Sequence, residues 1–301
     1  MRILIYGAGV IGSLYAAYLF EAGYSVSVLA RGERLRDLKQ IGLRYFRYGK
    51  IQCANITVIE ELNPSDDYDF IFLTVREEQL CTALISLCGN VSPTIVTMVN
   101  TTEPYAELDA LCGSGRLLPA FPGAGGGFTN GVLDAGLTPS IIQPTTFGEI
   151  DGRSSKRVKT LKGIFTKARI PCQIVKDMHI WQICHLAMVV PLADAYYTTE
   201  RPQEAGKDKN GMRRTAVQLH ENFTRLRQCG ISISPPKLNL FRLCPVGILC
   251  KVLSTVFRSR FGDRFMFQHA MKAKKEMQIL HNKLYSYLEE NHNKSATPNQ
   301  P

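Results

Sequence analysis

The stretch MRILIYGAGVIGSLYAAYLF (residues 1–20) decides the fold of this chain. A short run of apolar, β-branched residues ends at Gly7, and Gly9 and Gly12 follow at the spacing G-x-G-x-x-G. Taken alone, this spacing is a weak signal, because it also occurs in ordinary corners between a strand and a helix. The residues around it therefore decide whether the loop binds a nucleotide.

These flanking residues predict a β-α-β unit. Apolar positions recur at helical spacing from Ile11 to Ala22, Gly23 is placed to end that helix, and SVSVLA (25–30) is typical of a second strand. In this setting the first glycine permits a tight turn, the second lets the backbone approach a pyrophosphate, and the third lets helix and strand pack closely. Amides at the helix start would then hold the phosphates of a dinucleotide. The predicted cofactor-binding loop is Gly7, Ala8, Gly9, Val10, Ile11 and Gly12.

The two halves of the chain differ in pattern. DFIFLTV (69–75) and TIVTMVN (94–100) are typical of further buried strands between helical stretches, which indicates a doubly wound parallel sheet covered on both faces. From about residue 171, long amphipathic stretches dominate, at 181–198, 211–229 and 264–290. We expect an α/β fold with a nucleotide-binding domain over 1–170, an all-helical domain over 171–290 that binds substrate or a second copy, and a disordered tail over 291–301.

Composition indicates an ordinary globular chain with uneven charge. The formal net charge is +10, and residues 171–301 carry 19 Lys and Arg against 10 Asp and Glu. No RNP motif, zinc finger or arginine tract accompanies this excess, so we expect no nucleic-acid partner; an anionic ligand, an acidic partner and a solvated basic face stay open. The nine cysteines form no C-x-x-C pairs and no window is apolar enough to cross a bilayer. We expect a cytoplasmic protein with reduced thiols, no metal site and no membrane span.

The end of the second predicted strand indicates which dinucleotide is bound. Proteins that prefer NAD place Asp or Glu there for the ribose hydroxyls, whereas this chain has Ala30 and Arg31, followed by Arg34. A guanidinium makes planar, bidentate contacts to phosphate, so Arg31 predicts the 2′-phosphate of NADP. An arginine that is merely exposed on the surface is the alternative.

Several segments resemble ketopantoate reductases. GAGVIGSLYAAYLFEAGYSVSVLARGERLRDLKQIGL (7–43) looks like the amino-terminal segment of that family, and the likeness continues through FLTVREEQ (72–79) and TIVTMVNTTE (94–103). It weakens across LLPAFPGAGG (117–126) and TTFGEIDG (145–152) and is poor beyond about residue 195. The resemblance implies a Rossmann domain followed by a helical domain, with NADP and a 2-oxo acid substrate in the cleft between them.

The same resemblance assigns roles to individual residues. Arg76 stands where the family has a lysine near the cofactor phosphates, and Asn100 where it has an asparagine beside the nicotinamide and the substrate. The family's general acid, the lysine of W-x-K, corresponds to Ile183, and an asparagine four residues later corresponds to Ala187. Neither aliphatic side chain can donate a proton or stabilise an alkoxide, so half of the expected pocket is missing.

Other side chains are candidates for the missing roles. His179 would share a helical face with Ile183, and a histidine titrates in a range suited to proton donation; His185 points largely elsewhere. Glu276 on the last predicted helix is a candidate for substrate binding. Each of these residue types on a helix is more often an ordinary surface or hydrogen-bonded residue. CPVGILCKVLSTVFRSRF (244–261) is apolar with basic interruptions, which favours a buried helix in the core or in a homodimer interface over contact with a membrane or partner.

Two functions follow from these features. The chain is an NADPH-dependent reductase of a 2-oxo acid, with Asn100 beside the reacting atoms and a different proton donor, or a bound water, in place of the lysine. Alternatively, it binds NADPH with little or no catalysis and acts as a sensor or a scaffold. The completeness of the predicted cofactor loop favours the enzyme, whereas Ile183 and Ala187 favour the alternative or a changed substrate.

Overall fold

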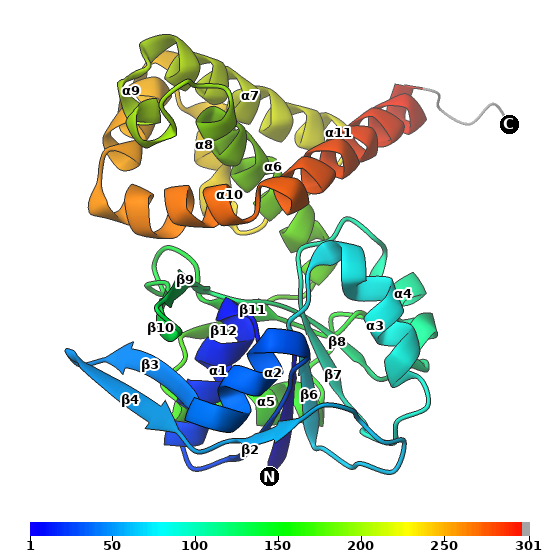
Figure 1. Cartoon of the computed structure of the whole chain (residues 1–301). Coiled ribbons are helices and arrows are strands. Elements are labelled where there is room, and N and C mark those ends of the chain that lie inside the picture. Colours follow the sequence, from blue (N-terminus) through cyan, green and yellow to red (C-terminus); the bar gives the residue numbers. More distant parts are fainter. Residues whose placement is uncertain (297–301) are drawn as a thin grey trace, which may run out of the picture. The chain divides into compact units, whose positions relative to one another are not determined.

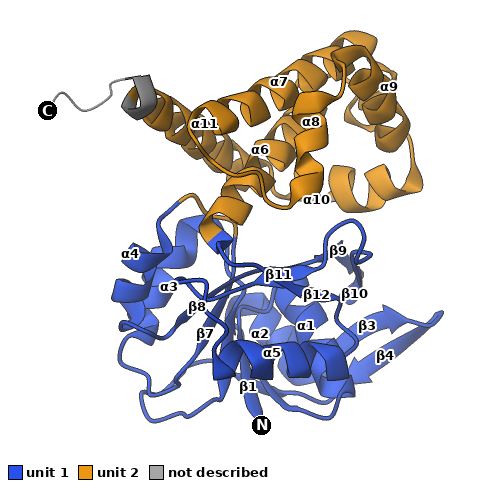
Figure 2. Ribbon diagram, turned by 180° about the vertical axis from the view of Figure 1, so that it is seen from behind, with its two compact units in different colours: residues 1–99, 103–178 blue, residues 100–102, 179–301 orange. Residues whose placement is uncertain are grey.

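The computed structural model describes residues 1–296, which form two compact units (Figures 1 and 2). Unit 1 comprises Met1–Val99 and Glu103–Met178, and unit 2 comprises Asn100–Thr102 and the chain from His179 onward. The sequence placed the division earlier, after residue 170. The difference arises because β12 (Cys172–Ile174) pairs in parallel with β11 (Thr145–Phe147) and so extends the sheet of unit 1.

Unit 1 is built on an eight-stranded sheet of order β12-β11-β8-β7-β6-β1-β2-β5. Its other strands are β1 (Arg2–Tyr6), β2 (Ser25–Leu29), β5 (Thr57–Ile59), β6 (Phe70–Leu73), β7 (Ile95–Met98) and β8 (Leu117–Phe121). The strands from β5 to β8 pair in parallel, which confirms the predicted doubly wound sheet, while β11 runs antiparallel to β8. The strand order reverses at β1, and ligands of such sheets bind at the carboxyl end of that reversal.

Helices connect the parallel strands. They are α1 (Val10–Glu21), α2 (Gly32–Ile41), η1 (Glu77–Gln79) with α3 (Leu80–Leu87), α4 (Tyr105–Cys112) and α5 (Lys156–Lys167). Strand β6, FIFL, is buried at every position, as expected of a central parallel strand. The rings of Tyr15, Phe72, Phe147 and Phe165 meet with centroids 5.5 to 6.5 Å apart and join α1 and α5 to the sheet.

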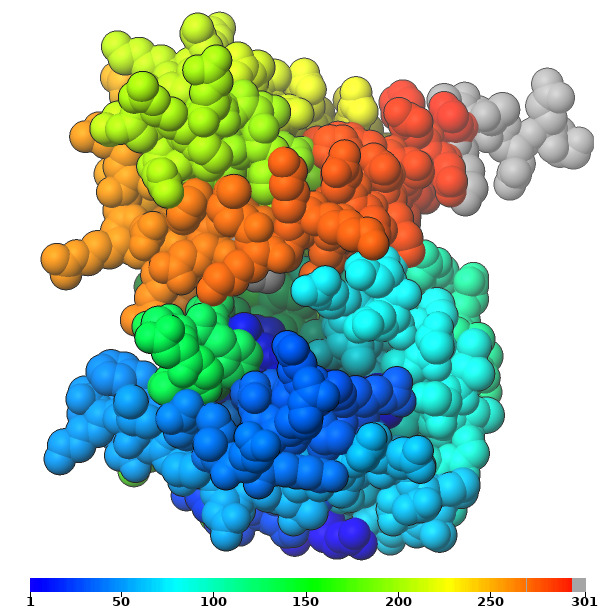
Figure 3. All heavy atoms as spheres, in the orientation of Figure 1, coloured from blue at the N-terminus to red at the C-terminus, as the bar shows by residue number. Residues whose placement is uncertain are grey.

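A second sheet of unit 1 was not predicted from the sequence. It has the order β4-β3-β10-β9 and consists of β3 (Leu43–Arg47), β4 (Lys50–Ala54), β9 (Ala124–Thr129) and β10 (Val132–Leu137). Asn130 and Gly131, both at positive φ (49° and 74°), form the two-residue turn between β9 and β10, and Asn-Gly is a strong hairpin signal. In the space-filling view the green β9–β10 hairpin lies against the blue region of α1 and α2 (Figure 3).

A buried ion pair connects the strands of unit 1 to α5. The Glu149 carboxylate accepts hydrogen bonds from Arg157 Nε at 2.8 Å and from the hydroxyl of Ser155, the residue that caps α5. The Arg157 guanidinium also donates to the carbonyl oxygens of Gly115 and Leu117. Burial opposes ionisation of Glu149, but the hydrogen bonds from Arg157 and Ser155 outweigh it and hold the pKa of this carboxyl below its ordinary value.

We therefore expect Glu149→Gln to lower the free energy of unfolding at pH 7 by about 1–3 kcal/mol. Because the folded-state pKa is depressed, this contribution is complete above the unfolded value of about 4.3 and is lost as the pH falls through the folded value. Urea unfolding of wild type and variant should thus differ at pH 7 and converge in acid. Glu61→Gln, at an exposed carboxylate elsewhere in unit 1, is the control and should leave stability nearly unchanged. A constant difference between wild type and Glu149→Gln at all pH values would contradict the expectation.

Unit 2 is helical. Its elements are α6 (Met178–Tyr197), η2 (Pro202–Lys207), α7 (Lys209–Gln228), η3 (Pro236–Asn239), α8 (Leu240–Leu243), α9 (Val246–Phe257), η4 (Gly262–Phe267), α10 (Gln268–Lys272) and α11 (Lys274–Ala296). The single helix predicted over 264–290 is divided, with a bend at Ala273 that no proline or glycine explains. Of the predicted tail, residues 291–296 continue α11, and residues 297–301 lie outside the described residues.

A proline inside α6 is accommodated by a side chain from α7. Pro191 has no N–H, so it cannot bond the carbonyl oxygen of Ala187 four residues earlier. Asn222 Nδ2 donates to that oxygen at 3.1 Å instead and is itself buried. This bond fixes α6 against α7 at Ala187, the position that corresponds to an asparagine in the family that the chain resembles.

Candidate functional site

At two of the three glycines in the loop after β1, the surrounding atoms leave no room for a side chain. Gly7 has φ +115°, and a Cβ there would lie 2.8 Å from the carbonyl oxygen of Thr74. A Cβ on Gly12 would lie only 2.0 Å from the carbonyl oxygen of Gly7. The Thr74 hydroxyl donates to that same Gly7 oxygen at 2.8 Å, so β1, β6 and α1 meet closely here. Gly7 and Gly12 thus permit the close packing that the sequence predicted.

Gly9 differs, because a Cβ there would meet no atom of the chain within 4 Å. The protein's own packing therefore does not require glycine at this position. Helix α1 begins directly after it with no side-chain cap on Gly9 and no acidic residue in the first turn. Backbone amides at an uncapped helix start attract an anion, and the open space in front of Gly9 leaves room for one.

Arg34 fixes the other side of the loop. Its Nε donates to the Ala8 carbonyl oxygen at 3.2 Å and its Nη2 to Ser13 Oγ at 3.3 Å. The guanidinium carbon lies 4.4 Å from the ring centroid of Phe128 in β9. Burial lowers the pKa of Arg34 below its ordinary value, with Asp37 opposing this. The sequence pointed to Arg34 only as a neighbour of Arg31, and its partner Phe128 belongs to the sheet that was not predicted.

The two predicted phosphate ligands lie at the ends of neighbouring strands. Arg31 follows β2, has extended backbone (φ −134°, ψ 163°) and is exposed at the start of α2. Arg76 follows β6, is also exposed, and its N–H donates to Gln79 Oε1 at 3.4 Å. Both strands flank β1, so both arginines follow the strand ends on either side of the glycine loop. Exposed guanidiniums at these ends are suited to bind phosphate.

The remaining candidates belong to unit 2. Asn100, two residues beyond β7, is half-buried, and among the described residues its Oδ1 has no hydrogen-bond partner although no water reaches it. A buried polar atom without a partner is costly, which makes this amide a candidate for contact with a ligand. His179 in the first turn of α6 is half-buried and its ring lies 5.9 Å from that of Tyr287. Glu276 is half-buried in the first turn of α11.

Positions 183 and 187 are part of the apolar core of unit 2. Ile183 and Ala187 are both 0% exposed and pack with residues of α6, α7, α9 and α11. His185 is also buried, and its ring stacks on that of Trp181 with centroids 5.2 Å apart and an angle of 6° between the planes. The residues that replace the expected lysine and asparagine therefore fill space in the core, and the structure supplies no acid at either position.

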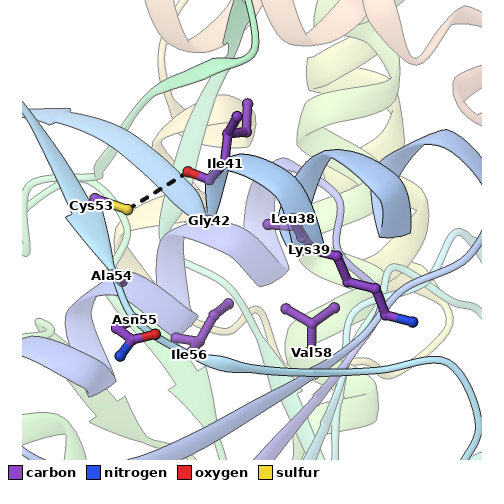
Figure 4. Close-up of a pocket in the computed structure, with 9 residues that line it drawn as sticks. All are labelled: Leu38, Lys39, Ile41, Gly42, Cys53, Ala54, Asn55, Ile56 and Val58. Carbon is purple, nitrogen blue, oxygen red and sulfur yellow. Dashed lines mark hydrogen bonds between the residues drawn. The ribbon is translucent and has the colours of Figure 1, made fainter.

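A shallow hollow of about 600 Å³ lies elsewhere on unit 1, between α2, β4 and β5 (Figure 4). It is lined by Leu38, Lys39, Ile41, Gly42, Cys53, Ala54, Asn55, Ile56 and Val58. The thiol of Cys53 is directed to the Ile41 carbonyl oxygen, with sulfur and oxygen 3.8 Å apart (Figure 4). None of the residues predicted to bind cofactor or substrate lines this hollow.

Several known proteins are similar to this chain. Residues 3–130 match the family described as ketopantoate reductase PanE/ApbA. The chain is 26% identical to 2-dehydropantoate 2-reductase of Mesorhizobium japonicum (60% of this chain, 62% of that protein) and 29% identical to that of Archaeoglobus fulgidus (60% and 58%). It thus matches less than two thirds of the length of these curated relatives. The crystal structure of 2-dehydropantoate 2-reductase from Methylococcus capsulatus aligns with TM-score 0.63 at 17% identity over 99% of both chains, which shows a shared fold.

Proposed function

We propose that the chain is a divergent member of the ketopantoate reductase family and an NADPH-dependent oxidoreductase that reduces a 2-oxo acid of the ketopantoate type, which the similarity to that family supports. The observation that carries the proposal is the contrast within the glycine loop. Two glycines are required by packing, whereas Gly9 is required only if something outside the chain occupies the space in front of it. An uncapped helix start at that point favours a diphosphate.

The side chains around the loop fit NADPH. Arg31 and Arg76 follow the strands on either side of β1 and offer bidentate contacts to the 2′-phosphate and to the diphosphate respectively. Arg34 Nε donates to the Ala8 carbonyl oxygen and so fixes this part of the loop. Asn100, with its unpartnered amide oxygen, is the candidate that would orient the nicotinamide and the substrate.

Bound NADPH would supply the hydride for the carbonyl carbon, and the chain must supply the proton for the carbonyl oxygen. The geometry excludes position 183 from this task, because an aliphatic side chain occupies it and is wholly buried. His179, one turn earlier on α6 and half-buried, is the titratable side chain of α6 that we assign to proton donation. Glu276 is the candidate that would hold a polar group of the substrate.

A second function, binding of NADPH without turnover, is favoured by one observation. Ile183 and Ala187 are integrated in the core of unit 2, so a helix that supplies a general acid in the family has a packing role here. The chain would then report on the cofactor as a sensor or scaffold, with the glycine loop and the arginines unchanged.

One experiment separates the two functions. Purified protein is titrated with NADPH by calorimetry and then incubated with NADPH and a panel of 2-oxo acids, including ketopantoate, while absorbance at the nicotinamide band is followed. Binding with consumption of NADPH supports the reductase. Saturable binding without consumption of NADPH by any 2-oxo acid supports the sensor, and the absence of binding by folded protein contradicts both.

The role of Arg31 in binding the 2′-phosphate is tested by comparing the affinities for NADPH and NADH. We expect Arg31→Ala to weaken NADPH binding by about 10- to 100-fold, because a charge-assisted bidentate contact to phosphate is lost, and to leave NADH binding unchanged. Arg36→Ala on the same helix is the matched control, since Arg36 is exposed and its nearest carboxylate, on Glu33, lies 3.9 Å away. Equal losses for both cofactors, or tighter binding of NADH by the wild type, would show that Arg31 does not bind the 2′-phosphate.

We further propose that the protein acts in a reducing compartment, the cytoplasm. All nine cysteines are free thiols in the structure, and three of them, Cys53, Cys81 and Cys88, are exposed. Exposed thiols persist where glutathione and thioredoxin keep them reduced.

A further inference from the structure

The segment that contains α8 and α9, drawn as part of unit 2 in Figure 2, presents large apolar side chains to solvent. Leu240 and Leu243 of α8 are 65% and 63% exposed, and Ile248 and Val252 of α9 are 55% and 50% exposed. Within each pair the residues are three or four positions apart and so share one side of their helix. Only the short turn between the two helices separates Leu243 from Ile248, so the two pairs are close in sequence.

Helix α9 is apolar on two sides. Leu249, Leu253 and Phe257, at intervals of four residues, are buried in the core of unit 2. The sequence favoured a buried helix here, and the structure buries only this side of it. A second side carries Ile248 and Val252 together with Lys251, all exposed. One apolar side is enough to pack a helix onto its own protein, so the second side is available to contact another protein or a membrane.

The geometry of the segment favours contact along a surface. The helical stretches Pro236–Leu243 and Val246–Phe257 together pass the length and composition expected of a membrane span, but they are bent by 118° at the turn between them. Among residues 1–296 no single helix is long and apolar enough to cross a bilayer. Helices with one polar and one apolar side can instead lie in the interface of a bilayer, with aliphatic side chains below the headgroups.

The charge around these helices has one sign. Between Glu221 and Asp263 the chain has seven Lys and Arg residues and no Asp or Glu. Lys251, Arg258 and Arg260 are exposed, and no carboxylate of the described residues lies within 4.0 Å of their charged nitrogens. A surface that combines exposed aliphatic side chains with unneutralised positive charge matches a bilayer of anionic phospholipids, whose headgroups bear phosphate and carboxylate.

This positive charge also indicates whether the α8–α9 surface contacts a second copy of the chain or a membrane. A symmetric dimer through α8 and α9 would bring the basic residues of two copies into one interface without any carboxylate of this segment to neutralise them, which is unfavourable. We propose that α8 and α9 form a peripheral binding surface for anionic phospholipid membranes, with Leu240, Leu243, Ile248 and Val252 entering the headgroup region and Lys251 and its basic neighbours contacting the lipid phosphates. The inference is independent of the proposed reductase activity, because none of these residues belongs to the candidate site.

The test is co-sedimentation of the full-length protein with two kinds of vesicle. One contains phosphatidylcholine alone, and the other also contains about 30% phosphatidylserine, the kind of anionic lipid that attracts basic segments. We expect at least about tenfold tighter partitioning to the anionic vesicles, reduced strongly in about 0.5 M NaCl, where charges are screened within a few ångströms. Failure to bind anionic vesicles at low salt would overturn the proposal.

Matched variants locate the surface. In the triple variant Leu243→Ser/Ile248→Ser/Val252→Ser, partitioning to anionic vesicles should weaken by about tenfold or more. Each substitution removes apolar area that would be buried in the headgroup region. Lys251→Gln/Arg260→Gln should lose the preference for anionic over neutral vesicles. Ile85→Ser/Val91→Ser in unit 1 is the control, because Ile85 and Val91 are similarly exposed at 58% and 60% and should leave partitioning unchanged.

Thermal unfolding verifies that every variant is folded. Two outcomes contradict a membrane surface at α8 and α9: equal partitioning of the triple variant and the wild type, or concentration-dependent dimerisation of the wild type that the triple variant abolishes. The second outcome would assign the face to another copy of the chain.

Discussion

Gly12→Ala is expected to destabilise unit 1 by about 3 kcal/mol and to abolish measurable NADPH binding. The added Cβ would lie 2.0 Å from the carbonyl oxygen of Gly7 and 2.5 Å from the hydroxyl oxygen of Thr74. The nearest of these atoms belongs to the backbone of the loop, so α1 must move away from β1 and β6 to accept even a methyl group. The amides at the start of α1 would move with it and no longer converge in front of the loop.

Gly9→Ala is the informative comparison, since its Cβ would touch no atom of the chain. We expect its free energy of unfolding to remain within about 0.5 kcal/mol of the wild type, as for surface substitutions, while NADPH binding weakens by about tenfold or more. Urea unfolding measures the first quantity and calorimetry the second. A Gly9→Ala protein that binds NADPH as the wild type does would show that the space in front of the loop is not used by a ligand.

Ile183→Lys is expected to lower the free energy of unfolding by about 4 kcal/mol and not to create a ketopantoate reductase. Ile183 is 0% exposed among aliphatic residues of unit 2, so a lysine there must be buried without a partner or lose its proton. Either outcome corresponds to a shift of several units in the pKa of the lysine, and each unit costs about 1.4 kcal/mol of stability. Chemical unfolding and NADPH consumption with ketopantoate measure the two effects.

Ile183→Met controls for the change of shape alone, because a volume-conserving apolar replacement costs less than about 1.5 kcal/mol. The decisive opposite result is an Ile183→Lys protein that is as stable as wild type and oxidises NADPH with ketopantoate faster than wild type does. The side chain at 183 would then be accessible to substrate, and the lower activity of the wild type toward ketopantoate would be due to the missing acid.

The sequence predicted those parts of the fold that depend on local pattern. Strands β1, β2, β6 and β7 and helix α1 were predicted within a few residues, because continuous apolar runs and helical periodicity are written in neighbouring residues. The glycine loop was predicted for the same reason. The sheet of β3, β4, β9 and β10 was missed, although Asn130-Gly131 marked one of its turns, because glycine-rich AGGGFT lacks the alternation of a half-buried strand.

The candidate site was less predictable because its remaining contacts are distant in sequence. Arg34 is held by the Ala8 carbonyl and by Phe128 of the missed sheet, and neither partner is visible from the local pattern around Arg34. The role of Asn222 depends on Pro191 of another helix, which leaves the Ala187 carbonyl to be satisfied. The burial of Ile183 could not be read from α6, whose apolar residues occur on all sides of the helix.

The filled core around position 183 also limits which positions of this chain can accept a new catalytic side chain. Ile183 belongs to an apolar cluster that also contains residues of α7, α9 and α11, so a lysine introduced at this position would enter a core filled by apolar side chains. Accommodating a lysine there would require several residues of the cluster to shrink or move together, and each of these changes alone would lower stability. A general acid is therefore introduced into this chain at lower cost at a half-buried position than at position 183.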